Sequence, residues 1–328
     1  MITEAAALTT ADLHLLAEAG GRAPSLHNSQ PWRFRPTPDG RGLEVHADPT
    51  RAVPAVDPDG RALHVSIGAA LFNLRVAAAH LGRDAAVRLL PSGEDAQPRA
   101  VLDLSAPGGT KHPLGDLYPA IAARHSSRQP FANRDVPEAL VAELITAALA
   151  EGVILTVLEE HGVRRVLALT SEAEDRIAAD AAREAETRSW LRLEPSVDGI
   201  PLTALGSHDR DARVPMRGFT GHPPHPASPA ERFEALPQLA TLSTHFDGRA
   251  DWLRSGQALE RVWLLATAHG LRASVLHQAV ELPDTRWRLR DPVEGPGHVQ
   301  LVLRVGYGPP GAATPRRPVE DVLDPPEG

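Results

Sequence analysis

The sequence contains no cysteine. This absence excludes disulfides, cysteine-ligated zinc, iron–sulfur clusters and cysteine nucleophiles. The sequence also lacks any run near 18 uncharged apolar residues, about the length that spans a membrane. Its first residues, Met1 to Ala5, do not place a basic region before an apolar one, as a secretory signal would. We therefore expect no membrane partner and a cytoplasmic, reducing location.

Positive charge is also scarce, because 34 Lys and Arg residues stand against 42 Asp and Glu residues, a formal net charge of −8. Neutralising the phosphates of a long nucleic acid requires a basic face, so we expect no nucleic-acid partner. Aromatic residues make up 4% of the chain, whereas hydrophobic residues make up 42% of its 328 residues. A chain of this length and composition can bury a large core and corresponds to about two domains.

Hydrophobic spacing and turn residues predict a mixture of helices and strands. Helices are expected at 10–20, 61–81, 119–124, 137–150, 162–185 and 256–269, and strands at 32–34, 43–46, 87–90, 100–104, 153–158, 239–245 and 299–305. A Pro- and Gly-rich stretch at 105–115 is expected to link two halves. Residues 190–236 are rich in Pro, Gly and His, and so long a loop is typically functional or disordered. The tail from Pro309 is expected to be extended.

An internal repeat supports the division into halves. The segment GAALFNLRVAAAHLG, from Gly68 to Gly82, aligns with GQALERVWLLATAHG, from Gly256 to Gly270. The glycines are fourteen residues apart in both (82 − 68 and 270 − 256), and a strand is expected after each helix. These features favour two related α+β halves, each with a central helix on a sheet. The alternative is chance similarity between two apolar helices.

The densest polar cluster is PSLHNSQPW, from Pro24 to Trp32, between an expected helix and an expected strand. Such a loop offers hydroxyl, amide and backbone groups to a planar heterocycle or a polyol. The alternative is a capped loop in which Ser25 and Asn28 satisfy their own backbone.

A second cluster, RHSSR, runs from Arg124 to Arg128. Two arginines four residues apart share a face of a helical turn, and with a serine hydroxyl they suit a phosphate. The alternative is a solvated basic surface. A third basic pair, Arg316 and Arg317, lies near the end of the chain and could be an exposed tail.

Two tempting motifs fail on physical grounds. Gly306 to Gly311 matches G-x-G-x-x-G, but its two prolines cannot open a helix whose amides face a pyrophosphate. His222 and His225 flank two prolines without an accompanying carboxylate–histidine framework, so we expect no metal.

Taken together, these segments resemble one known family. PSLHNSQPW resembles the P-S-x-x-N-x-Q-P-W signature of the nitroreductase family of FMN flavoproteins, and RHSSRQPF resembles its phosphate motif. The C-terminal LVLRVGYGPPGAATPRRPVEDVL resembles the family's last strand and basic tail. GRALHVSIGAALFNLRVAAAHLG looks like the Acg-like actinobacterial branch. The resemblance runs from about residue 12 to the end, except for 186–250.

The order of the motifs is the reverse of that in ordinary family members, where the flavin lies at a homodimer interface. The resemblance therefore implies an α+β nitroreductase-like fold in which a dimer is fused into one chain, each half an antiparallel-type sheet packed around a central helix. The halves are expected at 1–110 and 116–328, with 190–250 as a lid. We expect one composite flavin site per chain, and further pairing of two chains stays open.

The resemblance also implies which residues bind the cofactor. From the first half these are Pro24, Ser25, His27, Asn28 and Gln30, and from the second half Arg124, His125, Ser126, Arg128, Ser274, Arg316 and Arg317. Arg124, Ser126, Arg128 and one of the two C-terminal arginines would hold the FMN phosphate. His125 would contact the flavin edge, and the segment around Ser274 would approach the flavin N5. No side-chain catalytic residue and no metal are implied, since the chemistry is centred on the flavin.

The family activity implied is hydride transfer from NAD(P)H through FMN N5 to a small electron acceptor such as a nitroaromatic or a quinone. An alternative is an FMN-sequestering protein in which the lid prevents useful turnover. A third reading is a protein that binds no flavin and acts through protein contacts, and the paired motifs argue against it.

Overall fold

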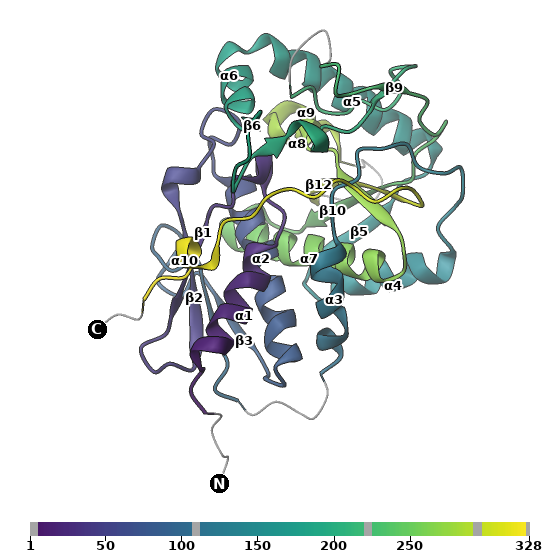
Figure 1. The fold of residues 1–328 in the computed structure, drawn as a ribbon. Coiled ribbons are helices and arrows are strands. Elements are labelled where there is room, and N and C mark those ends of the chain that lie inside the picture. The colour runs from purple at the N-terminus through teal and green to yellow at the C-terminus, as the bar shows by residue number, and fades with distance from the viewer. Residues whose placement is uncertain (1–5, 107–111, 220–224, 291–296, 326–328) are drawn as a thin grey trace.

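The computed structural model describes residues 6–106, 112–219, 225–290 and 297–325. They include two four-stranded antiparallel sheets (Figure 1). The first has the order β1-β2-β4-β3 and consists of β1 (Trp32–Pro36), β2 (Gly42–Ala47), β3 (Ala86–Leu89) and β4 (Ala100–Asp103). The second has the order β11-β12-β10-β5 and consists of β5 (Ile154–Val157), β10 (Leu239–Thr244), β11 (Arg272–Val275) and β12 (His298–Gly306). The hairpin and sheet strands expected from the sequence are therefore confirmed.

Helices pack against both sheets and between them (Figure 1). The longer ones are α1 (Thr10–Gly21), α2 (Arg61–His80), α4 (Glu138–Leu149), α5 (Glu160–Ala179), α6 (Ala181–Ser189) and α7 (Arg249–Ala268). The shorter ones are α3 (Tyr118–Ala123), α8 (Gln278–Glu281), α9 (Pro283–Arg288) and α10 (Val319–Val322). The expected helix at 162–185 is two helices, because Asp180 ends α5 and caps α6 by accepting from the amides of Ala182 and Arg183.

The two helices of the internal repeat, α2 and α7, pack directly against each other. A Cβ atom at Gly68 would lie 2.1 Å from the carbonyl oxygen of Leu253, and one at Gly256 would lie 1.9 Å from that of Val65. Each glycine thus meets the carbonyl three residues before the other glycine (256 − 253 and 68 − 65). The contact is reciprocal, and any side chain at either position would push the helices apart.

Helix α2 is long and apolar enough to cross a membrane by length and composition alone. Of its most apolar window, 89% is buried inside the structure, against α1, α7 and the first sheet. A buried core helix passes the same test, so its apolar sequence is explained by its central position.

The segment before β10 is ordered by packing and is not a structureless loop. It contains the short strands β6 (Leu191–Arg192), β7 (Ile200–Pro201), β8 (His208–Asp209) and β9 (Ala230–Glu231). Ile200, Leu205 and Phe219 are buried in a small cluster of their own. The lid boundary expected at residue 250 requires correction, because β10 is a largely buried strand between β5 and β12, and α7 begins at Arg249 rather than near 256. We call residues 190–238, where described, the covering segment.

The C-terminal tail crosses from the second sheet to the first (Figure 1). Leu323 forms a bridge with Phe34 of β1, and the amide of Asp324 donates to the carbonyl of Phe34 at 2.7 Å. The tail is extended as expected until α10. It thereby brings residues 312–317 beside the loop that follows α1.

Candidate functional site

The loop after α1 is held in an unusual backbone conformation. His27, Asn28 and Gln30 have φ values of 52°, 55° and 52°, in the left-handed region that side chains rarely adopt. The hydroxyl of Ser25 accepts from the amide of Gln30 at 2.9 Å and closes the loop. Strain of this kind persists where the surroundings fix it and is common at binding sites.

Two adjoining cavities open beside this loop. The large cavity has about 830 Å³ of empty space, counting space open to solvent, and its walls include Ala62, Val65, Met216, Arg217, Phe219, Leu259, Trp263, Ser274, Leu276 and His277. The smaller one has about 440 Å³ and includes Asn28, Arg124, His125, Ile200, Thr314 and Arg316, so we call it the arginine cavity. Both share Pro24, Ser25, His27, Ser126 and Arg128. Segments far apart in the sequence therefore line two cavities that adjoin each other.

Arg124 anchors the arginine cavity to the core. Its Nη2 donates to the carbonyl of Arg22 at 2.9 Å, and its Nε lies 3.1 Å from a carboxylate oxygen of Glu260 on α7. Its guanidinium also lies 4.9 Å from the ring centre of Trp263. Burial raises the pKa of the Glu260 carboxyl to about 7, against the opposing effect of Arg124. These contacts hold the Arg124 side chain in place, and the residue also lines the arginine cavity.

Two further arginines, Arg128 and Arg316, line the arginine cavity together with Arg124. Arg128 donates to the carbonyl of Ala204 at 2.9 Å, and burial lowers its pKa to about 10. Arg316 donates to the side-chain oxygen of Asn28 at 3.0 Å, and burial together with Arg124 lowers its pKa to about 9. Desolvated positive charges that repel one another favour a bound anion.

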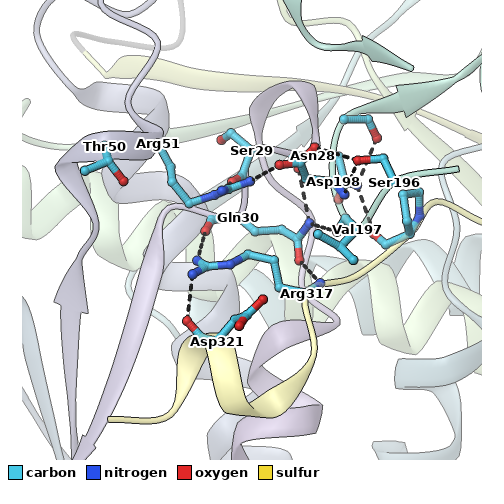
Figure 2. Close-up of polar contacts among 12 residues, drawn as sticks. Asn28, Ser29, Gln30, Thr50, Arg51, Ser196, Val197, Asp198, Arg317 and Asp321 are labelled. Carbon is cyan, nitrogen blue, oxygen red and sulfur yellow. Dashed lines mark hydrogen bonds and ion pairs between the residues drawn. The ribbon is translucent and has the colours of Figure 1, made fainter. Parts of the chain in front are cut away.

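Gln30 and Arg317, both expected to bind cofactor, line neither cavity. The Gln30 side chain is fully buried, donates to the carbonyl of Val197 at 3.0 Å and accepts from the amide of Arg317 at 2.8 Å (Figure 2). Arg317 donates to the carbonyl of Asp321 at 2.7 Å and lies 3.5 Å from a carboxylate oxygen of Asp48. The polar atoms of both side chains are bound by other protein groups. Gln30 and Arg317 therefore connect the 24–30 loop, the covering segment and the C-terminal tail. Of the two C-terminal arginines, only Arg316 faces the arginine cavity.

Asn28 has both roles considered for the first motif, because it binds neighbouring backbone and also lines the site. Its amide nitrogen donates to the carbonyls of Gly199 and Pro315, each at 3.0 Å, and its oxygen accepts from Arg316. Asn28 also lines the arginine cavity. It therefore positions the covering segment and the tail at the rim of the site.

The second motif is docked onto the second sheet. Ser126 bridges to Ala273 of β11, and the amide of Ser127 donates to the carbonyl of Ala273 at 3.0 Å. His125 lines the arginine cavity, and burial followed by the nearby Arg124 lowers its pKa. The RHSSR cluster is thus a rigid wall of the site and not a solvated surface.

Several buried polar atoms around the cavities have no hydrogen-bond partner within the described part of the chain. They are His27 Nε2, Arg217 Nη1, Ser274 Oγ and His277 Nε2 at the large cavity, and Arg316 Nε at the arginine cavity. Burial is the largest cause that lowers the pKa of His27 and of His277 well below the usual range, so both are neutral. Unpartnered buried polar groups are costly, and their gathering here indicates a bound polar molecule.

The sequence motifs did not identify every residue of the site. Met216, Arg217 and Phe219 reach the large cavity from the covering segment, where no periodicity marks them. Trp263 lies in the repeated helix, so its place on a cavity wall could be found only once α2 and α7 were paired. Of the histidine pair considered for a metal, His222 lies outside the described residues. Within the described ranges, no group of three or more His, Asp or Glu side chains is placed to hold a metal.

Relatives among curated proteins span nearly the whole chain. A Mycobacterium tuberculosis protein named “putative NAD(P)H nitroreductase” is 33% identical over 316 residues, which cover 93% of this chain and 89% of the relative. A second one from the same organism, acg, is 31% identical over 326 residues, which cover 96% of each chain. The chain belongs to the Acg-like nitroreductase family. The family expected from the two motifs is therefore confirmed.

No family model matches this member of the nitroreductase family. Among solved structures, the FMN- and NADPH-dependent nitroreductase NfnB from a Sphingopyxis species aligns with 63% of this chain and 97% of its own. The TM-score of this alignment is 0.39 and the identity is 19%.

Proposed function

We propose that this chain is an FMN-dependent NAD(P)H oxidoreductase of nitroreductase type. The observation that carries the proposal is the pair of adjoining cavities, one largely apolar and one lined by Arg124, Arg128 and Arg316. FMN has the matching shape, with a planar ring system at one end and a phosphate of about two negative charges at the other. The family membership supports the same cofactor.

The residues present fit FMN on their own chemistry. The unpartnered atoms His27 Nε2, Ser274 Oγ and His277 Nε2 face the large cavity, where the polar edge of a flavin ring could satisfy them. Val65, Leu259 and Trp263 supply apolar contact for the ring faces. Arg124, Arg128 and Arg316 would hold the phosphate, with Ser126 as a further donor.

When bound, FMN supplies hydride transfer from NAD(P)H to a small acceptor such as a nitroaromatic or a quinone. The chain positions the ring, excludes water with Met216 and Phe219, and supplies positive potential at the large cavity from Arg128. Since His27 and His277 are neutral, each can donate or accept a hydrogen bond at the ring edge.

The chain is further proposed to be a fused dimer with halves at 1–110 and 116–328. Each half holds one four-stranded sheet and one long central helix, and the Gly68 and Gly256 contacts are reciprocal. Position 75 is equivalent to Trp263 (75 − 68 and 263 − 256), but Arg75 is paired there with Glu151, which also binds Arg261. A cavity beside these residues is lined by α2, by α7 and by the segments 79–85 and 112–114. None of these segments resembles the 24–30 loop in sequence. This arrangement supports one flavin per chain.

The alternative, FMN sequestration without turnover, is favoured by one observation. The covering segment is tied across the site by Asn28 to Gly199 and by Arg217 to Glu281, so it could hinder entry of NAD(P)H. Steady-state NAD(P)H oxidation with menadione separates the two. The oxidoreductase proposal expects a rate well above that of an equal concentration of free FMN, and a rate equal to free FMN would favour sequestration.

A further inference from the structure

Another cavity, which we call the outer cavity, lies between the covering segment and α5. It has about 1020 Å³ of empty space, counting space open to solvent, and its walls include Glu174, His208, Asp209 and Val214. Met216, Arg217 and Phe219 line both this outer cavity and the large cavity. These three side chains therefore lie between the proposed flavin position and the outer cavity.

Arg217 is the charged one of these three side chains, and it is held in place. Its Nη2 forms an ion pair with Glu281 of α8, and the two side chains are only 9% and 2% exposed. The amide of Gly218 donates to Glu174 of α5 at 2.7 Å, which fixes the adjoining backbone. The guanidinium is thus pinned from one side by a buried carboxylate.

The other amino group of Arg217, Nη1, is buried and has no partner among the described residues. A charged donor left unpaired in a desolvated position is costly, whereas an oxygen acceptor supplied by a ligand would satisfy it. Arg124, Arg128 and Arg316 already serve the proposed flavin from loops and tail. Arg217 instead approaches from the covering segment, where a molecule entering from the outer cavity would meet it.

We infer that Arg217 is the residue that binds the electron acceptor, donating through Nη1 to an oxygen of a nitro or quinone group, and that Glu281 is its positioning residue. This inference rests on the proposed function. The acceptor class is set by the donor, because an uncharged acceptor oxygen can approach a guanidinium that Glu281 already neutralises.

The test compares Arg217→Met, which keeps the aliphatic length and removes the donors, with the wild-type protein. Equilibrium dialysis against menadione is done on the proteins as purified, so the measurement does not depend on NAD(P)H oxidation. FMN content and the KM and kcat for menadione are measured alongside. Arg213→Met is the matched control, because Arg213 lies in the same segment and pairs with Asp211 at the surface.

We expect Arg217→Met to raise the menadione Kd and KM about tenfold, with FMN content and kcat within about twofold of wild type, since one charge-assisted hydrogen bond is lost. Arg213→Met should leave all four values unchanged. An unchanged menadione Kd in Arg217→Met would overturn the inference. Loss of FMN in that variant alone would also overturn it, because Arg217 would then hold the flavin. A wild-type protein that binds menadione but does not oxidise NAD(P)H contradicts the oxidoreductase proposal, and the comparison of menadione Kd values then still decides whether Arg217 binds the quinone oxygen.

Glu281 is tested by conservative rescue. Glu281→Leu should raise the menadione KM in the same direction, whereas Glu281→Gln, which keeps an oxygen to hold the guanidinium, should recover most of the affinity. Because a lone buried Arg217 charge could prevent folding, the apolar double variant Arg217→Met/Glu281→Leu is measured as well. Equal menadione affinity in Glu281→Leu and wild type would remove the positioning role.

Discussion

Arg124 shows how one side chain joins both halves of the site. Its carbonyl partner, Arg22, ends the first helix, and its carboxylate partner, Glu260, lies on the second central helix. Its remaining face borders the arginine cavity. A residue held by Arg22, Glu260 and the Trp263 ring is oriented before any ligand arrives, which lowers the entropic cost of binding.

The phosphate assignment predicts a loss of cofactor affinity at Arg316. Arg316→Ala should weaken FMN binding roughly 10- to 100-fold, because a charge-assisted hydrogen bond to phosphate contributes about 1.5–3 kcal/mol. Flavin fluorescence titration measures this affinity. Arg88→Ala on β3 is the control, since Arg88 is exposed, lies on the sheet edge opposite β1 and lines neither cavity. If Arg316→Ala retains FMN as tightly as Arg88→Ala, Arg316 is not a phosphate ligand.

The raised pKa of Glu260 predicts that the free energy of unfolding depends on pH. Its pKa is raised from 4.5 to about 7 in the folded chain, so between those values the folded state holds a proton that the unfolded state has lost. Stability contributed by protonated Glu260 is therefore present below about pH 4.5 and is lost as the pH rises to about 7. Glu260→Gln should become more stable relative to wild type over this range, by up to about 3 kcal/mol. Urea unfolding at pH 5 and pH 8 checks this, and a pH-independent difference would contradict it.

At the scale of the elements, the close packing of α2 and α7 positions the residues of the site. Their glycines allow backbone contact, and the helices supply Val65 on one side and Leu259 and Trp263 on the other to the large cavity. The 24–30 loop contacts α2 at Ser66 and Arg124 contacts α7 at Glu260, both within four residues of the glycines in contact.

Gly68→Ala should therefore be strongly destabilising, because its Cβ would lie 2.1 Å from the Leu253 carbonyl oxygen. Overpacking of a core typically costs 1–3 kcal/mol, and here backbone must move, so we expect about 3 kcal/mol or more in urea unfolding. Gly21→Ala is the matched control, since a Cβ there meets nothing within 4 Å and the residue is helical. Equal stability of the two variants would contradict the close helix contact.

Much of the secondary structure could be predicted from the sequence. Alternating and helical spacing located the hairpin 32–47 and helix α2 because tertiary contacts reinforce the local pattern there. The break at Asp180 was missed, since the hydrophobic pattern continues across a capping residue. The roles of Gln30, Arg217 and Arg317 were not predictable, because they depend on which distant segment lies opposite.

At the scale of the whole molecule, the proposed fused dimer would place one composite site across its two halves. The first half contributes the 24–30 loop and the start of α2, and the second contributes 124–128, α7, β11 and the tail. On the equivalent side of the helix pair, Arg75 and Arg261 share Glu151. The proposed dimer fusion therefore accounts for the internal repeat and for a single binding position.

The most direct measurement is the amount of flavin released from the purified full-length chain. The visible spectrum is recorded, the chromophore is released and identified, and its amount is compared with the protein concentration. One FMN per chain is the predicted result, because the 24–30 loop and the 124–128 segment each occur once. Two FMN per chain would contradict the single composite site, and a colourless protein that also fails to take up added FMN would contradict the proposed function.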